Sequence, residues 1–270
     1  NDQMSYEKDL SETSEAFFAA SVLVNLKAQV LESDVFPEEI LGFEDEIDMD
    51  NQETPRLTIY IDVKSPYAFV ALMPTLELER DLGLLFDWKP LTLDIPSYLG
   101  SARKDDSGKL IENNRSKSQW SGVKYAYKDA RRYANQQGKT LLGTQKIWDS
   151  SIANIAISWV SMVDRKRLAD YMNNVFTQFW ERKLDIEDMQ VICEILSVSK
   201  VTTKGFEEFA LGEGLEQHDL LQKSFHERGI FGVPTYEFPD EFLFGREHLP
   251  YVRWRLLGRP GNAPDIAYLQ

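Results

Sequence analysis

The pair of residues best suited to chemistry in this sequence is Ser65-Pro66, which follows an apolar, strand-like run. Proline is favourable at the first position of a helix because its missing N–H has no partner there, so we expect a helix to begin here. Free N–H groups and a partial positive charge at a helix start favour a thiolate. The Ser65 hydroxyl could therefore donate a hydrogen bond to the thiolate of a bound thiol, or it could simply cap the helix.

A second candidate lies far along the chain, in Gly232-Val233-Pro234-Thr235, just before a predicted hairpin. Cis peptide bonds occur almost only before proline. A cis bond facing the helix start would leave the backbone of Val233 free to pair with an extended ligand. We therefore predict that the Val233–Pro234 bond is cis and that Pro234 lies close to Ser65.

Other reactive residues form no local motif. Cys193 is the only cysteine, which excludes an internal disulfide and a two-cysteine redox cycle. His218, His226 and His248 are too widely spaced for a local metal motif, and we expect no metal site. Five aromatic residues in the middle of the chain are either ordinary core or the lining of a pocket: Tyr125, Tyr127, Tyr133, Trp148 and Trp159.

The elements that must position Ser65 and Pro234 follow from hydrophobic spacing. Alternating apolar residues predict a strand over 57–63, followed by a helix over 67–82 and a strand over 85–90. Turn residues between apolar pairs predict a hairpin of 235–238 and 242–244, and a final helix over 247–257. Between these parts we predict helices over 116–137, 149–164, 168–182, 186–197 (capped by Asp185), 205–211 and 215–228.

This order of elements predicts the fold class. Without the helical block the chain reads βαβ–ββα, which is the arrangement of a thioredoxin. We therefore predict an α/β, thioredoxin-like fold with an all-helical insertion. Its parts are an acidic, partly helical N-terminal extension (1–54), the first part of the thioredoxin domain (55–100), the insertion (101–228), and the second part with a C-terminal tail (229–270).

Four segments together resemble the kappa-class glutathione transferases and the 2-hydroxychromene-2-carboxylate isomerases, a branch of the DsbA-like thioredoxin superfamily. They are DVKSPY at 62–67, YAYKDARRYA at 125–134, GIFGVPT at 229–235 and FGREHL at 244–249. The resemblance spans residues 56–258. It implies that Ser65 is catalytic and activates the thiol of bound glutathione, and that Val233, before cis Pro234, pairs with glutathione through its backbone.

The resemblance also implies a site for the γ-glutamyl group of glutathione. The family has a small neutral residue and an acid at the start of the last helix, and Arg246-Glu247 occupies this place. A basic residue of the insertion is also implied, and Lys117 matches it loosely. Two positions depart from the family pattern, since Arg246 replaces a small neutral residue and Lys64 replaces an apolar one.

Charge is distributed unevenly along the chain. The net charge is -14, and residues 1–54 hold 15 acids and 2 bases, whereas the rest of the chain is nearly neutral. A helix is predicted over 14–31, with Ser14 as its cap. The acidic segment 38–50 also carries Ile40, Leu41, Phe43 and Ile47. It could act as a docking tail or cover a basic surface, or it could be a solvated, partly ordered arm.

These features lead to two main functional hypotheses. The first is a glutathione-dependent isomerase or transferase that acts on a small electrophile, aromatic or unsaturated, as a cytoplasmic homodimer. The second is a non-catalytic thioredoxin-like interaction protein, which the changes at Lys64 and Arg246 favour; a thiol-disulfide oxidoreductase is a third and weaker alternative. The chain outside residues 1–54 is nearly neutral and shows no basic stripe, so we expect no nucleic-acid partner. No apolar run is long enough to cross a bilayer, so we expect no membrane partner.

Overall fold

A computed structural model, which describes residues 57–105 and 107–265, places a four-stranded sheet at the centre of the fold. The strand order is β2-β1-β5-β6, with β1 at Thr58–Ile61, β2 at Asp87–Pro90, β5 at Thr235–Glu237 and β6 at Phe242–Phe244. β1 runs parallel to β2 and antiparallel to β5, and β5 pairs antiparallel with β6. The predicted βαβ and ββα halves are therefore joined in one sheet.

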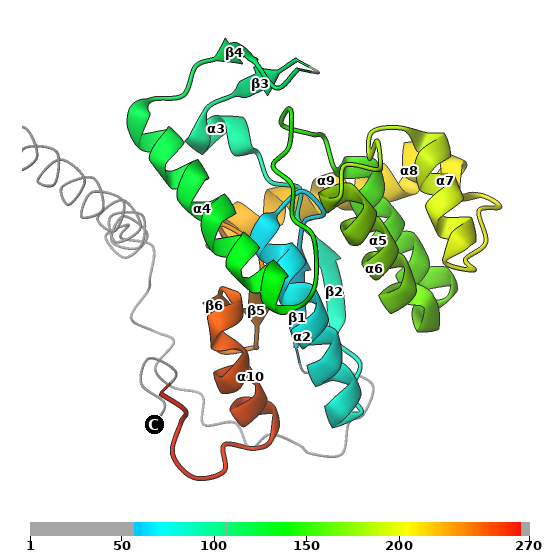
Figure 1. The fold of residues 1–270 in the computed structure, drawn as a ribbon. Helices are drawn as coiled ribbons and strands as arrows, with labels where there is room; N and C mark the ends of the chain where they lie inside the picture. Colours follow the sequence, from blue (N-terminus) through cyan, green and yellow to red (C-terminus); the bar gives the residue numbers. More distant parts are fainter. Residues whose placement is uncertain (1–56, 106, 266–270) are drawn as a thin grey trace, which may run out of the picture.

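The helix that carries the site is α2, at Pro66–Leu82, which leaves the end of β1 (Figure 1). Ser65 is its N-cap and accepts a hydrogen bond from Ala68 N at 3.2 Å, with Pro66 in the first turn, as the sequence predicted. Gly83 ends the helix with a φ of 62°, a left-handed conformation that glycine adopts without strain. At the other end of the chain, η3 (Arg246–His248) leads into α10 (Leu249–Leu256), and both contact α2.

The insertion lies between β2 and β5 and is mostly helical. Figure 1 shows α3, α4 and a small hairpin on one side of α2, and the bundle of α5 to α8 on the other. Among the described residues, no helix is long and apolar enough to span a bilayer. The elements are α3 (Ile95–Leu99), β3 (Ala102–Lys104), β4 (Leu110–Asn113), α4 (Lys117–Gln136), α5 (Ser151–Val163), η2 (Arg165–Arg167), α6 (Leu168–Trp180), α7 (Met189–Val198), α8 (Phe206–Leu211) and α9 (Glu213–Glu227).

The insertion differs in one respect from the all-helical expectation, because β3 and β4 pair as an antiparallel hairpin. Asp105 closes its turn by accepting hydrogen bonds from Ser107 Oγ (2.6 Å) and Lys109 N (2.9 Å), while Gly108 takes a φ of 84°. The strands are short and largely exposed, so they lack the apolar alternation that identifies a half-buried strand.

Smaller differences concern helix ends. The prediction that Asp185 caps the helix after α6 is wrong: Asp188 caps α7, accepting hydrogen bonds from Gln190 N and Val191 N, while Asp185 accepts from Glu187 N in the preceding turn. The short α3 was not predicted. The helix predicted over 14–31 and the acidic segment 38–50 lie outside the described residues.

A fully buried tryptophan joins the insertion to the loop that carries the site. Trp180, the last residue of α6, packs against Phe69 of α2, with ring centroids 5.9 Å apart. Its indole Nε1 donates a hydrogen bond to the carbonyl oxygen of Val63 at 3.1 Å. Because Val63 is buried, no water can replace this donor.

We expect Trp180→Phe to lower the free energy of unfolding by about 1–3 kcal/mol, the cost of leaving a buried carbonyl without its donor. Urea denaturation followed by circular dichroism would measure the change. Trp254→Phe is the matched control, because Trp254 donates to Pro260 O at an exposed site. Equal stability of the two variants would contradict a role for Trp180 in holding the loop.

Candidate active site

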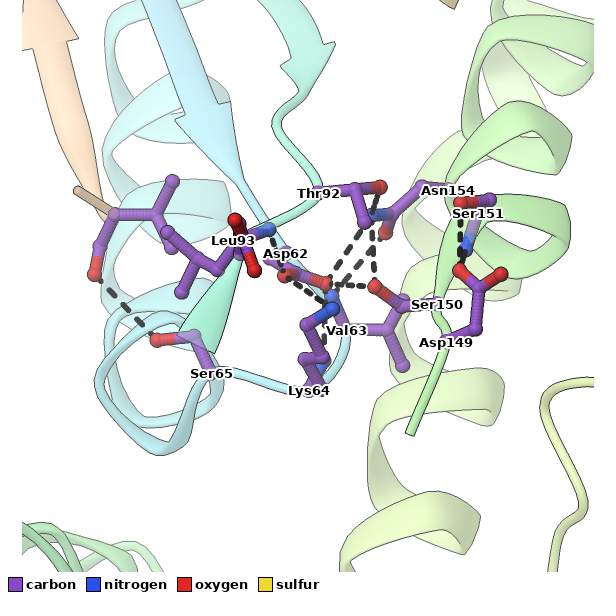
Figure 2. Close-up of polar contacts among 12 residues, drawn as sticks. Asp62, Val63, Lys64, Ser65, Thr92, Leu93, Asp149, Ser150, Ser151 and Asn154 are labelled. Atoms are coloured by element: carbon purple, nitrogen blue, oxygen red, sulfur yellow. Dashed lines mark hydrogen bonds and ion pairs between the residues drawn. The ribbon is translucent and has the colours of Figure 1, made fainter. Parts of the chain in front are cut away.

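Ser65 and the Val233–Pro234 bond meet at the start of α2. The Ser65 Oγ donates a hydrogen bond to the carbonyl oxygen of Val233 at 3.4 Å, across 168 residues of sequence (Figure 2). The Val233–Pro234 peptide bond is cis, as the sequence predicted. Ser65 is 3% exposed, and its hydrogen bond to Val233 is long, so the hydroxyl is oriented at the helix start but weakly held.

The loop before Ser65 is organised by the carboxylate of Asp62, which is fully buried (Figure 2). Asp62 Oδ1 accepts hydrogen bonds from Lys64 N (3.2 Å), Ser150 Oγ (2.5 Å) and Asn154 Nδ2 (3.1 Å). Asp62 Oδ2 accepts one from Leu93 N (2.8 Å). A buried carboxylate is tolerated only when its oxygens are satisfied in this way.

A second set of polar contacts extends from Asn154 on α5. Its Oδ1 accepts from Val63 N at 3.2 Å, and its Nδ2 donates to Thr92 Oγ1 at 2.8 Å. Thr92 Oγ1 in turn lies 2.9 Å from Nε2 of His218 on α9. Asn154 of α5 thus holds the loop that presents Ser65 directly, and His218 of α9 is connected to it only through Thr92.

Lys64 brings a positive charge into this network. Its side chain is 6% exposed, and its Nζ lies 3.9 Å from Asp62 Oδ2. Lys64 also acts on Asp149, just before α5: burial works to raise the pKa of Asp149, but the hydrogen bonds from Ser151 and the charge of Lys64 hold that pKa below its usual range. Asp62 is therefore the carboxylate paired with the Lys64 ammonium among the described ion pairs, and the charge of Lys64 also acts on Asp149.

Tyr67, in the first turn of α2, faces α4. Burial raises the pKa of its phenol, and nearby Asp129 and Tyr125 on α4 and Glu247 on η3 raise it further. Tyr67 is thus a neutral hydroxyl donor at any physiological pH. Its surroundings show that α4 and η3 converge on the start of α2.

Arg246 and Glu247 lie at this convergence but do not pair with each other among the described ion pairs. The Arg246 guanidinium stacks 3.9 Å above the ring of Tyr133 on α4, and its buried Nε has no hydrogen-bond partner. The Glu247 carboxylate folds back against Gly245, where a side chain would overlap it. Gly245 N donates to Pro234 O at 2.9 Å, which connects η3 to the cis bond.

Lys117 is not brought into this group. It is exposed at the first residue of α4, whereas the residues of α4 that act on Tyr67 lie two turns or more further along the helix. Its role in ligand binding stays a prediction. Two surface hollows, of about 470 Å³ at α8 and about 260 Å³ beside Trp148, also lie away from Ser65.

The other reactive residues do not converge on the site. Cys193 lies on α7, and burial raises the pKa of its thiol, which makes it a poor nucleophile. Within residues 57–105 and 107–265, no three His, Cys, Asp or Glu side chains are grouped as metal ligands. Of the five aromatic residues, Trp159 belongs to the core beside Phe206 and Phe209.

Comparison with known families agrees with this geometry. Residues 56–256 match the DsbA-like thioredoxin domain, which is well over half of the chain. The chain belongs to the DsbA-like thioredoxin family. No curated protein matches this DsbA-like chain in sequence.

Solved structures show the same fold at low identity. A 2-hydroxychromene-2-carboxylate isomerase is 22% identical with a TM-score of 0.58, covering 75% of this chain and 94% of its own. A probable DsbA oxidoreductase from Streptomyces coelicolor is 11% identical with a TM-score of 0.56, covering 78% and 93%. The cytosolic disulfide reductase DsbM from Pseudomonas aeruginosa, solved with GSH, is 12% identical with a TM-score of 0.50, covering 69% and 87%.

Sequence analysis missed most of the network behind the active-site loop of this DsbA-like protein. Ser150, Asn154 and Thr92 are common neutral residues with no distinctive spacing, so no local signal identifies them. Asp62 and Tyr67 belong to the DVKSPY motif at 62–67, but their roles depend on contacts with α4, α5 and η3. The amide of Asn154, on a helix whose other polar residues are serines, was the one available sign.

We expect Asp62→Asn to lower the free energy of unfolding by about 3–5 kcal/mol, because the buried Lys64 ammonium loses its counter-charge. Adding Lys64→Met should recover part of this loss. Urea denaturation would measure both, with Asp81→Asn, which breaks an exposed pair with Arg80, as the control. An Asp62→Asn variant as stable as the parent would show that the network does not hold the loop.

Proposed function

We propose that this chain is a glutathione-dependent isomerase or transferase that acts on a small aromatic or unsaturated electrophile. The observation that carries the proposal is the hydrogen bond from Ser65 Oγ, at the start of α2, to the carbonyl of Val233 before a cis proline. This places a hydroxyl donor, a helix N-terminus and a free backbone edge at one point. Glutathione, when bound, supplies a thiolate that adds reversibly to the electrophile, so that a double bond can rotate without net consumption of thiol.

The residues present fit such a ligand. The N–H of Val233 makes no hydrogen bond to any described residue, and it can pair with an extended peptide backbone. The buried Nε of Arg246 also lacks a partner, which suits a ligand carboxylate. Glu247 can hold an α-ammonium group, and the Ser65 hydroxyl can turn from Val233 to a sulfur atom.

The chain's own groups then set the protonation of the thiol. The start of α2 and the Ser65 hydroxyl both favour the anionic sulfur. In this proposal Tyr67, which burial keeps protonated, donates a hydrogen bond to a developing oxyanion of the substrate. With its single cysteine away from this point, the chain depends on a thiol brought by the ligand.

Ser65→Ala is expected to raise the pKa of the bound thiol by about 1–2 units, because it removes one hydrogen bond to a charged group. Thiolate absorbance against pH, with glutathione bound, measures the change. Ser65→Thr keeps a hydroxyl and should restore the pKa.

Ser116→Ala is the control for the loss of a helix cap, because Ser116 caps α4 in the same way that Ser65 caps α2. It should lower stability without moving the thiol pKa. An unchanged thiol pKa in Ser65→Ala would remove Ser65 from the proposed role, even if glutathione still binds.

Glu247→Gln keeps the shape of the side chain but removes its charge. Glutathione should bind roughly 10- to 150-fold more weakly, the equivalent of one charge-assisted hydrogen bond of about 1.5–3 kcal/mol. Calorimetric titration would measure the affinity, with the exposed Glu227→Gln as the control. Equal affinities for the two variants would show that the α-ammonium group of glutathione does not bind at Glu247.

The second candidate function is a non-catalytic interaction protein that uses the same site at the start of α2. It is favoured by the low exposure of Ser65 and by Lys64 and Arg246, which depart from the family pattern. Failure of the parent protein to bind glutathione at millimolar concentration would support this alternative and reject the enzyme. Homodimer formation and a role for Lys117 are further parts of the first proposal.

A further inference from the structure

One face of α4 carries a row of lysines, which corrects the expectation that the chain has no basic stripe. Lys117, Lys124 and Lys128 are spaced by seven and four residues, which places them on a single face of the helix. All three are exposed, and none forms an ion pair with another described residue. The opposite face packs inward through Ala130 and Ala134.

The hairpin before α4 carries two more lysines. Lys104 and Lys109 are exposed and have no ion pair among the described residues. Residues 101–140 hold ten basic and four acidic residues in a chain whose net charge is -14. We call the five residues Lys104, Lys109, Lys117, Lys124 and Lys128 the basic α4 surface.

Apolar side chains are also exposed around these lysines. Ile111 on β4 is 51% exposed, and Tyr125, next to Lys124, is 52% exposed. Figure 1 shows the hairpin at the end of α4 where the helix begins. A partner for this surface should therefore combine several negative charges with a few apolar groups.

The chain itself contains such a partner. Residues 38–50 hold seven acidic residues and no basic one, and interleave them with Ile40, Leu41, Phe43 and Ile47. We propose that this acidic segment docks on the basic α4 surface of the same chain. This inference does not depend on glutathione binding.

Reach and local concentration favour docking within one chain. An extended chain that starts from Leu57 reaches at most about 25 Å at residue 50 and about 65 Å at residue 38, and α4 is about 30 Å long. A tether of this kind holds its segment at an effective concentration in the millimolar range. A nucleic acid is the poorer occupant, because the acidic segment of the same chain would repel it.

Zero-length carbodiimide cross-linking of the full chain, with peptide mass spectrometry, tests the proposal. We expect links from residues 38–50 to Lys117, Lys124 and Lys128 in about tenfold excess over links to Lys200 and Lys204, because tethering concentrates the segment locally. The two control lysines are also exposed and form no ion pair with another described residue. They lie in the loop that follows α7, and α7 is on the opposite side of α2 from α4 (Figure 1). The links should fade in about 1 M salt, where the Debye length falls to about 3 Å.

Three results would overturn the proposal. The first is equal linking of the segment to the α4 lysines and to the control lysines. The second is no link to α4 while the ion pair of Lys146 and Glu187, at 2.5 Å, is still linked. The third is linking only between chains in a mixture of ¹⁴N- and ¹⁵N-labelled protein, which would assign the surface to the segment of a second copy.

Discussion

The buried carboxylate of Asp62 is the constraint on which the candidate site depends. It leaves water entirely, and it is compensated by two backbone N–H groups, a hydroxyl, an amide and the ammonium of Lys64. These donors come from three parts of the chain: the loop after β1, the segment after β2, and α5. Because each donor must stay in place to satisfy the carboxylate, the thioredoxin-like sheet and the insertion cannot shift independently at this point. The geometry of Ser65 therefore depends on insertion residues that lie far from it in sequence.

The sequence predicted the parts of the fold that follow from local rules. The apolar alternation of the first strand, the Ser65-Pro66 helix start and the Val233-Pro234 motif together identified which segments meet, although Ser65 and Val233 are 168 residues apart. The contacts of Ser150, Asn154 and Thr92 could not be predicted, because they depend on how the insertion packs. The β3–β4 hairpin was missed for a different reason, since exposed strands have no buried face to impose a pattern.

The absence of a redox pair restricts what this DsbA-like site can do. A dithiol cycle requires two sulfur atoms near one another, and the single Cys193 lies on α7 with a raised pKa. A serine at the helix start retains the electrostatic part of a thioredoxin site but cannot itself exchange electrons. The function proposed above uses only this electrostatic part, because its thiol is carried by the ligand.

Lys64 is best understood through the charge that it balances. The loop needs the Asp62 carboxylate for its shape, but a lone negative charge close to Ser65 would disfavour a thiolate there. The ammonium of Lys64, 3.9 Å from that carboxylate, offsets this charge. The electrostatic potential at the start of α2 is then set mainly by the helix N-terminus and the Ser65 hydroxyl, both of which favour an anion. A lysine in place of an apolar residue is thus compatible with an active site, since it compensates a carboxylate whose first role is structural.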